Sequence, residues 1–485
     1  MAVSLFQRGK SKALLQSMEK AEDYAQWSEL AAAWDHEQGL DEWKQDDACE
    51  SYDYRSIRQR LDILRDLRFR KDWHQLLFVL NEGVHGNLGG IGKPSLYNKA
   101  RLGTKNLITR YIDELCGALN DLNEVDDEII PLAEKQDFFL RASHCNGRTA
   151  LMLSGGAVLG FFHTGVLKAL FDQGLLPEII SGSSAGSILA ATACTYPDEE
   201  LRERLSLDNL HHEVEETSAI RPSLTLFGGS RAMDVDNLRD YLAKIIPDMT
   251  FQEAFELTGR KLNITVTGLS TQQAPRLLNA ITSPNVLIRS AVMASCAIYG
   301  IYPPVTLMCR NASGETVPYL PGMKWIDGSF ADDLPAKRLA RLYGVNHFIS
   351  SMTNPAALAI TPDPDAPRSR LRNLAHFQAR FLKLGAAEAM RFTRDNVRIK
   401  SPVINLMQHL TYGVLAQEYT ADINIFLRNR WDHPLRLLAP PTREAMHRLI
   451  HEGERSAWEK VEMVRNCTAV SRTLDNILHT RGWEK

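Results

Sequence analysis

Hydrophobic residues recur at helical spacing through the first part of the chain. Ile57, Leu61, Leu64 and Leu67 lie three and four positions apart with charged residues between them, and a similar pattern continues in HQLLFVLNEG. A glycine-rich break, HGNLGGIGKPSLY, follows, and the helical pattern resumes in TKNLITRYIDELCGALNDL. Apolar residues on one face and charges on the other are typical of amphipathic helices. We therefore predict an N-terminal helical domain over residues 1–145.

The pattern changes at GRTALMLSGGAVLGFFHTGVLKALFDQG. A short apolar run, Thr149 to Ser154, leads through glycines into a helical stripe that ends at Gly174. A second unit follows in EII, SGSSAG and SILAATACTY, and further strands are predicted at KLNITVTGL and LLNAI. The next helix is predicted to begin with Ser283 as N-cap and Pro284 at its first position. Alternating strands and helices predict an α/β layered sheet over residues 146–350.

Beyond this core, residues 351–485 are predicted to be mostly helical and to pack on it. After a proline-rich hinge, RSRLRNLAHFQARFLKLG combines five positive charges with an apolar stripe. The stripe consists of Leu371, Leu374, Phe377, Phe381 and Leu384. Two interpretations stay open: an apolar face that packs on the core, or a helix that lies in a membrane interface. The apolar loop around Leu226 and Phe227 is a second candidate for a membrane contact.

Composition narrows the class of protein. A chain of 485 residues with 44% hydrophobic and 24% charged residues is typical of a globular protein with more than one structural unit. The formal net charge of -3 argues against nucleic acid as the main partner, because nucleic-acid-binding domains usually carry a strongly basic balance. The sequence shows no secretory signal and no apolar run of about 18 residues that would cross a bilayer. We expect an intracellular, cytoplasmic protein, soluble or peripherally bound to a membrane.

The cysteines show no pattern of a disulfide framework, a metal site or a redox site. The chain has seven, an odd number, and they are scattered without the paired spacing of a zinc or redox site. We expect reduced and mostly buried thiols, with no bound metal.

The candidate chemistry begins with Ser184 in SGSSAG, where a strand gives way to a helix. Gly182 and Gly186 flank the serine, and such small neighbours permit the sharp turn of a nucleophile elbow. The start of a helix also directs backbone N–H groups toward developing negative charge. Taken alone, the pentapeptide from Gly182 to Gly186 is also compatible with an ordinary polar turn. Whether Ser184 is a nucleophile therefore depends on a proton acceptor and on oxyanion donors elsewhere in the chain.

Two further stretches supply those partners. Gly155, Gly156 and Ala157 in SGGAVLG also lie between a strand and a helix, so their amides would form an oxyanion hole if parallel neighbouring strands bring the two turns together. A phosphate-binding loop is the alternative for this run, although neither nucleotide fingerprint fits it. Asp327 in MKWIDGSFADDLP follows an apolar stretch and could accept the proton of Ser184 directly. An ordinary Asp-Gly turn is the alternative there.

These three stretches, in this order, resemble the patatin-like phospholipase family. The resemblance implies an α/β-hydrolase-related sheet, a catalytic dyad of Ser184 and Asp327, and oxyanion donors from Gly155 to Ala157. Other stretches, among them LDEWKQ, ASCAIYGIYPPV and QEYTADINI, resemble the subgroup related to intracellular triacylglycerol lipases, in which a helical domain of unknown function precedes the core. The resemblance to this family implies a lipid acyl hydrolase that forms a covalent acyl-enzyme and requires no cofactor. Its substrate is then a lipid, reached at a membrane or lipid-droplet surface.

Two positions depart from the pattern of the family. Ala157 and Leu159 stand where most patatins have a glycine and a basic residue. The missing cation favours neutral glycerides as substrates, while phospholipids and lysophospholipids stay open. Gly328 and Ser329 follow the aspartate where many relatives have two small residues, which is a minor change.

Other functions are also compatible with the sequence. His347 follows Asp327 and could complete a Ser-His-Asp triad, although its neighbours indicate a buried strand. We interpret His163 as structural. His36 and Asp41 have the spacing of an acyltransferase motif carried by some relatives, so lysophospholipid acyl transfer is one alternative. A catalytically silent lipid-binding or interaction module is an alternative from a different class.

Overall fold

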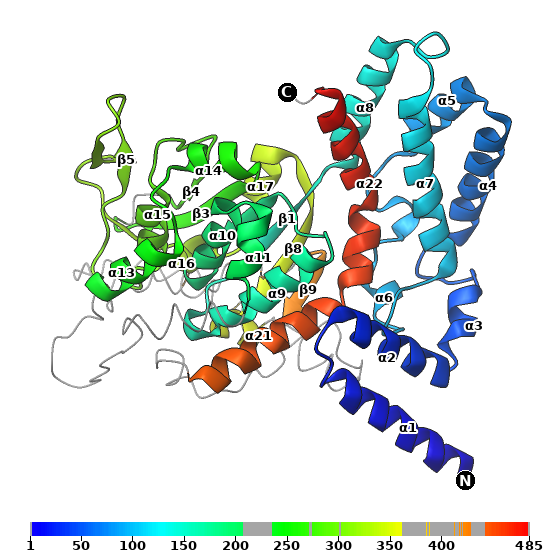
Figure 1. Cartoon of the computed structure of the whole chain (residues 1–485), viewed down its shortest axis with the longest axis horizontal. Helices are drawn as coiled ribbons and strands as arrows, with labels where there is room; N and C mark the ends of the chain where they lie inside the picture. The colour runs from blue at the N-terminus through cyan, green and yellow to red at the C-terminus, as the bar shows by residue number, and fades with distance from the viewer. Residues whose placement is uncertain are drawn as a thin grey trace.

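The computed structural model of the chain describes residues 2–206, 235–270, 274–299, 302–360, 421–427 and 442–483, with single residues at 385, 388, 412, 417 and 419. The amphipathic basic segment expected within residues 368–384 and the apolar loop around Leu226 and Phe227 lie outside these ranges. In the described part, helices fill the N-terminal region and a mixed sheet forms the core beyond it (Figure 1).

The N-terminal region is helical, as the spacing of its apolar residues predicts. Its helices are α1 (Ala2–Met18), α2 (Tyr24–Glu37), α3 (Leu40–Gln45), α4 (Tyr54–Arg70), α5 (Trp73–Gly83), α6 (Pro94–Tyr97), α7 (Asn106–Glu124) and α8 (Leu132–Asn146). The glycine-rich break contains a short 3-10 turn, Leu88–Gly90, before α6.

Local sequence explains where these helices begin and which face they bury. The side chain of Asp53 accepts the N–H of Ser56 at 3.2 Å and thereby caps α4. Asp72 caps α5 in the same way through the N–H of Gln75. The residues at helical spacing in α4 are all buried, namely Ile57, Leu61, Leu64 and Leu67. This buried face packs against α7.

The core sheet runs in the order β4-β3-β2-β1-β8-β9, and β7 pairs with β3 beside this path. Its strands are β1 (Arg148–Leu153), β2 (Ile179–Gly182), β3 (Lys261–Gly268), β4 (Arg276–Leu278), β7 (Trp325–Asp327), β8 (Val345–Met352) and β9 (Ile423–Phe426). The pairs β1 with β2, β1 with β8, β2 with β3 and β8 with β9 are parallel, whereas β4 and β7 run antiparallel to β3. The predicted α/β core is therefore confirmed, with a mixed sheet.

Helices connect and cover these strands. They are α9 (Phe161–Asp172), α10 (Ala185–Thr195), α11 (Asp198–Arg204), α13 (Val235–Ile245), α14 (Phe251–Thr258), α15 (Ile288–Ser295), α16 (Ser329–Asp332), α17 (Ala336–Tyr343) and α18 (Pro355–Ile360). A small hairpin of β5 (Met308–Arg310) and β6 (Thr316–Pro318) extends from the core.

The prediction that a helix begins with Ser283 as its N-cap was wrong, because α15 begins only at Ile288. Instead, the carbonyl of Ser283 accepts the N–H of Val286 at 3.1 Å, so Pro284 lies inside a tight turn. Proline suits the second position of such a turn for the same reason that it suits the first position of a helix, namely its fixed φ. Val286 and Leu287 then form bridges in extended conformation before the helix starts.

The C-terminal region contributes both helices and a strand. Residues after 442 form α21 (Arg443–Trp458) and α22 (Val461–Arg481), in agreement with the helical pattern. The edge strand β9 was not predicted, since QEYTADINI was interpreted only as part of a mostly helical region. Figure 1 shows α22 alongside α7 and α8, so the end of the chain packs on the N-terminal helices as well as on the core.

Helices α9 and α21 cross at two glycines. A Cβ atom at Gly165 would lie 1.9 Å from the carbonyl oxygen of Ile450, and one at Gly453 would lie 2.1 Å from that of Phe162. Both distances are far inside van der Waals contact, so the two backbones approach closely only because neither position carries a side chain. This crossing fixes α9, which follows the glycine run of the candidate site, against α21.

Two further expectations concern the cysteines and the membrane. All seven cysteines are free, but only Cys194 and Cys296 are buried, whereas Cys145 is exposed. The expectation of mostly buried thiols was therefore wrong, because four others are half-buried, two on helices, one on β5 and one in the loop after α3. None of the helices in the described ranges is both long and apolar enough to cross a bilayer.

Candidate active site

Ser184 lies on a sharp turn between β2 and α10. Its backbone has φ 50 and ψ −125, a conformation that costs free energy for a residue with a side chain and persists only where the surroundings hold it. The N–H of Ser184 donates to Ser295 Oγ at 2.9 Å, and its carbonyl accepts from Ser187 Oγ at 2.6 Å. The surroundings therefore hold this turn from both sides, as the nucleophile-elbow interpretation requires.

The two glycines beside Ser184 are required by close backbone contacts. A Cβ atom at Gly182 would lie 2.3 Å from the carbonyl oxygen of Gly186. One at Gly186 would lie 2.3 Å from the carbonyl oxygen of Leu153, at the end of β1. A larger residue at either position would displace the backbone of the turn, which explains the glycine on each side of the serine.

Asp327 ends β7, and the structure brings it next to Ser184. Its N–H donates to the carbonyl of Ala297 at 3.0 Å, and its Oδ1 accepts the N–H of Ser329 at 2.8 Å. The side chain of Ser184 lies near enough to this carboxylate to lower its pKa. Asp327 is 1% exposed, and this burial raises its pKa to about 6, although Ser329 and Ser184 act in the opposite direction.

The glycine run lies against Ser184 because β1 and β2 are parallel neighbours, with Leu153 opposite Gly182. A Cβ atom placed on Gly155 would lie 3.3 Å from Ser184 Cβ. The N–H of Gly155 is already engaged, since it donates to Asp333 Oδ1 at 2.8 Å. Among the described residues, no acceptor takes the N–H of Gly156 or Ala157. These two amides are the candidates for binding an oxyanion.

The predicted structural role of His163 agrees with its contacts. The side chain is buried beneath the glycine run, with Nε2 2.9 Å from the carbonyl oxygen of Ser154 and Nδ1 2.7 Å from Ser351 Oγ. Burial lowers the pKa of His163 to about 4, so the imidazole is neutral at physiological pH. It links the ends of β1 and β8 and carries no charge into the site.

The other histidines are not part of this arrangement. His347 pairs with Thr149 at the beginning of β1, whereas Ser184 follows the end of β2, opposite Leu153. Four residues of strand span about 13 Å, so His347 lies too far from Ser184 to complete a triad. His36 and Asp41 contact each other at 2.6 Å on the exposed surface of the N-terminal helices.

Helix α15 and the turn that follows it supply two groups that hold the site, and neither was identified from the sequence. Ser295 accepts the N–H of Ser184, and the carbonyl of Ala297, just after the helix, accepts the N–H of Asp327. A third group that the sequence did not reveal is Asp333, which binds Gly155. Ser295 and Asp333 occur within stretches that resemble the family, but no local pattern indicates their long-range contacts.

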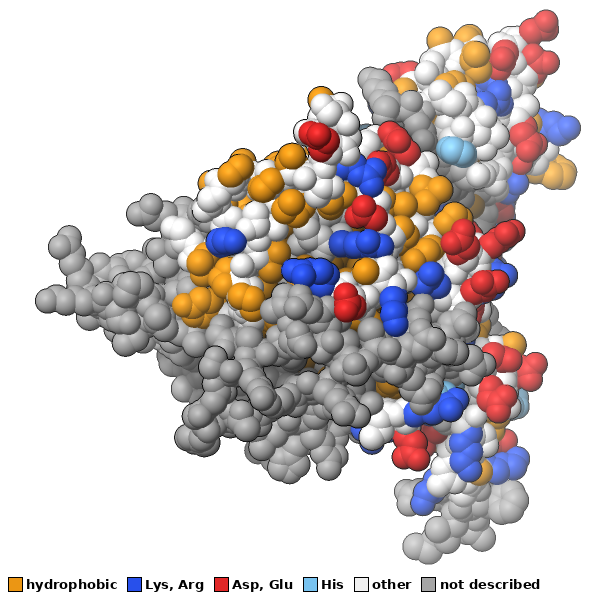
Figure 2. All heavy atoms as spheres, turned by 60° about the vertical axis from the view of Figure 1, so that its left-hand side comes forward, with side chains coloured by type: hydrophobic (Ala, Val, Ile, Leu, Met, Phe, Trp, Pro, Cys, Tyr) orange, Lys and Arg blue, Asp and Glu red, His pale blue; other side chains and the backbone are white. Residues whose placement is uncertain are grey.

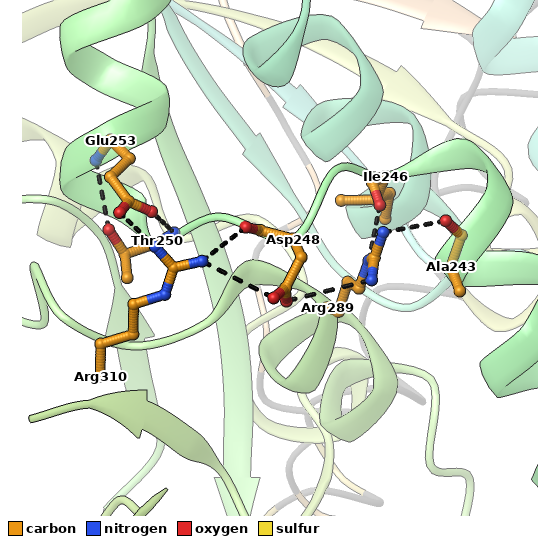
Figure 3. Close-up of polar contacts among 7 residues, drawn as sticks. All are labelled: Ala243, Ile246, Asp248, Thr250, Glu253, Arg289 and Arg310. Carbon is orange, nitrogen blue, oxygen red and sulfur yellow. Dashed lines mark hydrogen bonds and ion pairs between the residues drawn. The ribbon is translucent and has the colours of Figure 1, made fainter. Parts of the chain in front are cut away.

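The beginning of α15 is anchored by an arginine network (Figure 3). Arg289 Nε donates to the carbonyl of Ile246 at 2.6 Å, at the end of α13. Arg310 from the β5 strand donates to the carbonyl of Asp248 at 2.8 Å and pairs with Glu253 at 2.5 Å. Both arginines also lie within 4 Å of the carboxylate of Asp248, at 3.9 and 3.6 Å. The network fixes α13, α14 and the hairpin to the helix that supports Ser184.

A serine on a strand-to-helix elbow, beside a buried carboxylate and next to amides that have no acceptor among the described residues, is the arrangement of a serine esterase. Residues 151–340 match the patatin-like phospholipase family, and residues 4–144 match a domain of unknown function, DUF3336. The chain belongs to the patatin-like phospholipase family, so the resemblance seen in the sequence is confirmed.

Three relatives show how far the similarity extends. The chain is 32% identical over 472 residues to the triacylglycerol lipase ptl2 of Schizosaccharomyces pombe, covering 94% of this chain and 74% of ptl2. It is 34% identical over 469 residues to the triacylglycerol lipase ptl3 of the same organism, covering 93% of this chain and 94% of ptl3. It is 31% identical over 479 residues to the triacylglycerol lipase SDP1L of Arabidopsis thaliana, covering 94% of this chain and 57% of SDP1L. Family and relatives support an ester-hydrolysing enzyme of the lipid acyl hydrolase class.

Proposed function

We propose that this protein hydrolyses lipid esters through a dyad of Ser184 and Asp327. The observation that carries the proposal is the buried Asp327 carboxylate beside the side chain of Ser184, which lies on a strained turn. Ser184 Oγ attacks the ester carbon, its proton passes to Asp327, and the amides of Gly156 and Ala157 bind the oxyanion. The alcohol leaves with that proton, and water then releases the fatty acid from the acyl-enzyme. No step of this mechanism calls for a metal or a cofactor.

The environment of Asp327 suits the role of a base. A buried carboxylate with a raised pKa holds a transferred proton more readily than an exposed one, which increases its efficiency near neutral pH. The hydrogen bond from the N–H of Ser329 holds Oδ1 of the carboxylate in place. Burial therefore raises the pKa of Asp327, while the bond from Ser329 orients its side chain.

The pH dependence of hydrolysis follows from this pKa. We expect kcat/KM on a soluble ester to rise about tenfold per pH unit at acidic pH and to level off above about 6, because only ionised Asp327 accepts the proton. A second buried carboxylate, Asp333, has its pKa raised by burial to about 7. The variant Asp333→Asn removes that second titration, so the midpoint near 6 should persist in it. A midpoint near the ordinary value for aspartate, about 4, would contradict a perturbed Asp327.

We propose neutral glycerides as the preferred substrates. The similarity to three triacylglycerol lipases supports this choice, and so does Leu159, an apolar residue that is 8% exposed at the place where most patatins have a cation. The test is fatty-acid release from trioleoylglycerol emulsions compared with phosphatidylcholine and lysophosphatidylcholine at equal interfacial area. We expect the triacylglycerol to be hydrolysed fastest. Faster hydrolysis of either phospholipid would overturn the substrate assignment and leave the dyad intact.

The proposal includes an intracellular location at a lipid surface. The absence of disulfides among seven free cysteines is typical of proteins in reducing compartments. Figure 2 shows hydrophobic side chains together with Lys and Arg side chains on one face of the described part of the core. Apolar groups and cations together favour peripheral binding to anionic lipid surfaces. Binding to vesicles that contain anionic lipid, weakened by salt, is the expected behaviour.

A further inference from the structure

Asp333 touches both turns of the candidate site, although it belongs to neither. Its Oδ1 accepts the N–H of Gly155 at 2.8 Å, and its backbone carbonyl accepts Ser183 Oγ at 3.1 Å. Gly155 begins the glycine run, and Ser183 directly precedes Ser184. We propose that Asp333 is a positioning residue, which holds the glycine run against the elbow so that the N–H groups of Gly156 and Ala157 stay directed at the oxyanion. This inference rests on the proposed hydrolase function.

The carboxylate of Asp333 is engaged on both oxygens. Oδ2 accepts Asn354 Nδ2 at 2.8 Å, so one side chain links the loop after β1 to the loop after β8. Asp333 is 1% exposed, and a buried acceptor that loses its donor is destabilising because no water replaces the bond. Both bonds are therefore strongly favoured in the folded state. A backbone N–H changes direction only when its peptide plane rotates, so the bond to Gly155 holds the path of the main chain there.

The position of Asp333 itself is fixed by a residue from the C-terminal region. Its N–H donates to Gln417 Oε1 at 2.6 Å. Gln417 Nε2 donates in turn to the carbonyls of Ser329 and Phe330, at 3.2 and 3.1 Å. These carbonyls belong to α16, the short helix that directly follows Asp327 and Gly328. One glutamine thus ties Asp333 to the segment that carries the proposed base.

The conformation of the glycine run shows why it needs an external support. Ala157 has φ 49, which is unfavourable for a residue with a side chain. A Cβ atom at Gly156 would lie 2.2 Å from Thr353 Oγ1, so the run is also pressed against the loop after β8. A chain segment that pays such a conformational cost relaxes when its hydrogen bonds are lost. The amides of Gly156 and Ala157 would then turn away from the developing oxyanion.

The test compares Asp333→Ala with the conservative Asp333→Asn on a soluble ester. We expect the alanine variant to lose about 100- to 1,000-fold in kcat with little change in KM, which is the typical loss when one oxyanion donor is removed. The asparagine variant keeps an acceptor oxygen for the N–H of Gly155, so its kcat should lie within about tenfold of wild type. Asp332→Ala is the matched control, because Asp332 pairs with Arg338 at 3.0 Å and points elsewhere.

Each outcome decides the proposal. Wild-type kcat in Asp333→Ala would overturn it, and so would an asparagine variant as inactive as the alanine variant, since that would indicate proton transfer by Asp333. If Asp333→Ala does not fold by circular dichroism, Asn354→Ala replaces it, and an unchanged kcat there overturns the proposal. Ser184→Ala is measured in the same series. Activity that survives in Ser184→Ala contradicts the hydrolase mechanism, whereas Ser184-dependent activity that is insensitive to Asp333 contradicts only the positioning role.

Discussion

Replacing Ser184 with alanine is expected to lower kcat for ester hydrolysis by a factor on the order of 10⁶, the loss typical for removal of a catalytic serine. Alanine keeps the Cβ atom and leaves the N–H that donates to Ser295, so the turn should persist. The loss would therefore reflect the missing nucleophile. Turnover of a chromogenic short ester measures kcat, and circular dichroism with thermal unfolding verifies the fold.

Covalent labelling gives an independent readout of the same serine. A fluorophosphonate should modify the wild-type protein at Ser184, as detected by mass spectrometry of the peptide, and should leave Ser184→Ala unmodified. Ser143→Ala, on α8 in the N-terminal helices, is the control serine and should retain both activity and labelling. Hydrolysis that persists in Ser184→Ala would exclude the dyad. A wild-type protein that neither labels nor hydrolyses any ester would instead favour a silent lipid-binding module.

Replacing Asp327 with asparagine should lower kcat on the order of 10⁴-fold, as for other enzymes whose catalytic aspartate becomes an amide. The amide oxygen can still accept the N–H of Ser329, so the end of β7 should keep its structure. The amide cannot hold the proton of Ser184, so the hydroxyl stays poorly nucleophilic. The pH profile should lose its inflection near 6, since the group that titrates there has been removed.

A neighbouring carboxylate provides the control for this second variant. Asp332 lies on α16, and burial raises its pKa as well, but it pairs with Arg338. Asp332→Asn should therefore keep wild-type kcat and the inflection near 6. Should Asp327→Asn hydrolyse esters as fast as wild type, another group must accept the proton and the dyad assignment fails.

The sequence predicted those parts of the molecule whose signals are local. The helices of the N-terminal region follow from residues spaced along one face, as Ile57 and Leu61 illustrate, because helical neighbours are only a few positions apart. The elbow was predicted for the same reason, since Gly182 and Gly186 restrict a turn that is complete within a few residues. The order of the three stretches then indicated a family, although it did not establish the roles of Ser184 and Asp327, which stay predictions.

What the sequence could not reveal depends on contacts between distant residues. Ser295 supports Ser184 and Asp333 supports Gly155, but a lone serine or aspartate carries no mark of the partner that it meets after folding. The edge strand β9 was missed because a short strand of four residues is too brief for its alternation to stand out. Pro284 misled the prediction of a helix start because turns and helix starts favour the same fixed backbone angle.

The glycine crossing between α9 and α21 bears on when the core can form during synthesis. Helix α9 is made early, but the backbone that it meets at Gly453 is made only much later, and the edge strand β9 also follows the other strands of the sheet. A ribosome adds roughly 5–20 residues per second, so the faces of α9 and β8 stay uncovered for many seconds. Exposed apolar surface of this kind binds chaperones and aggregates. We therefore expect chains that end before α21 to be recovered bound to chaperones, and chains that extend through α22 to be protease-resistant.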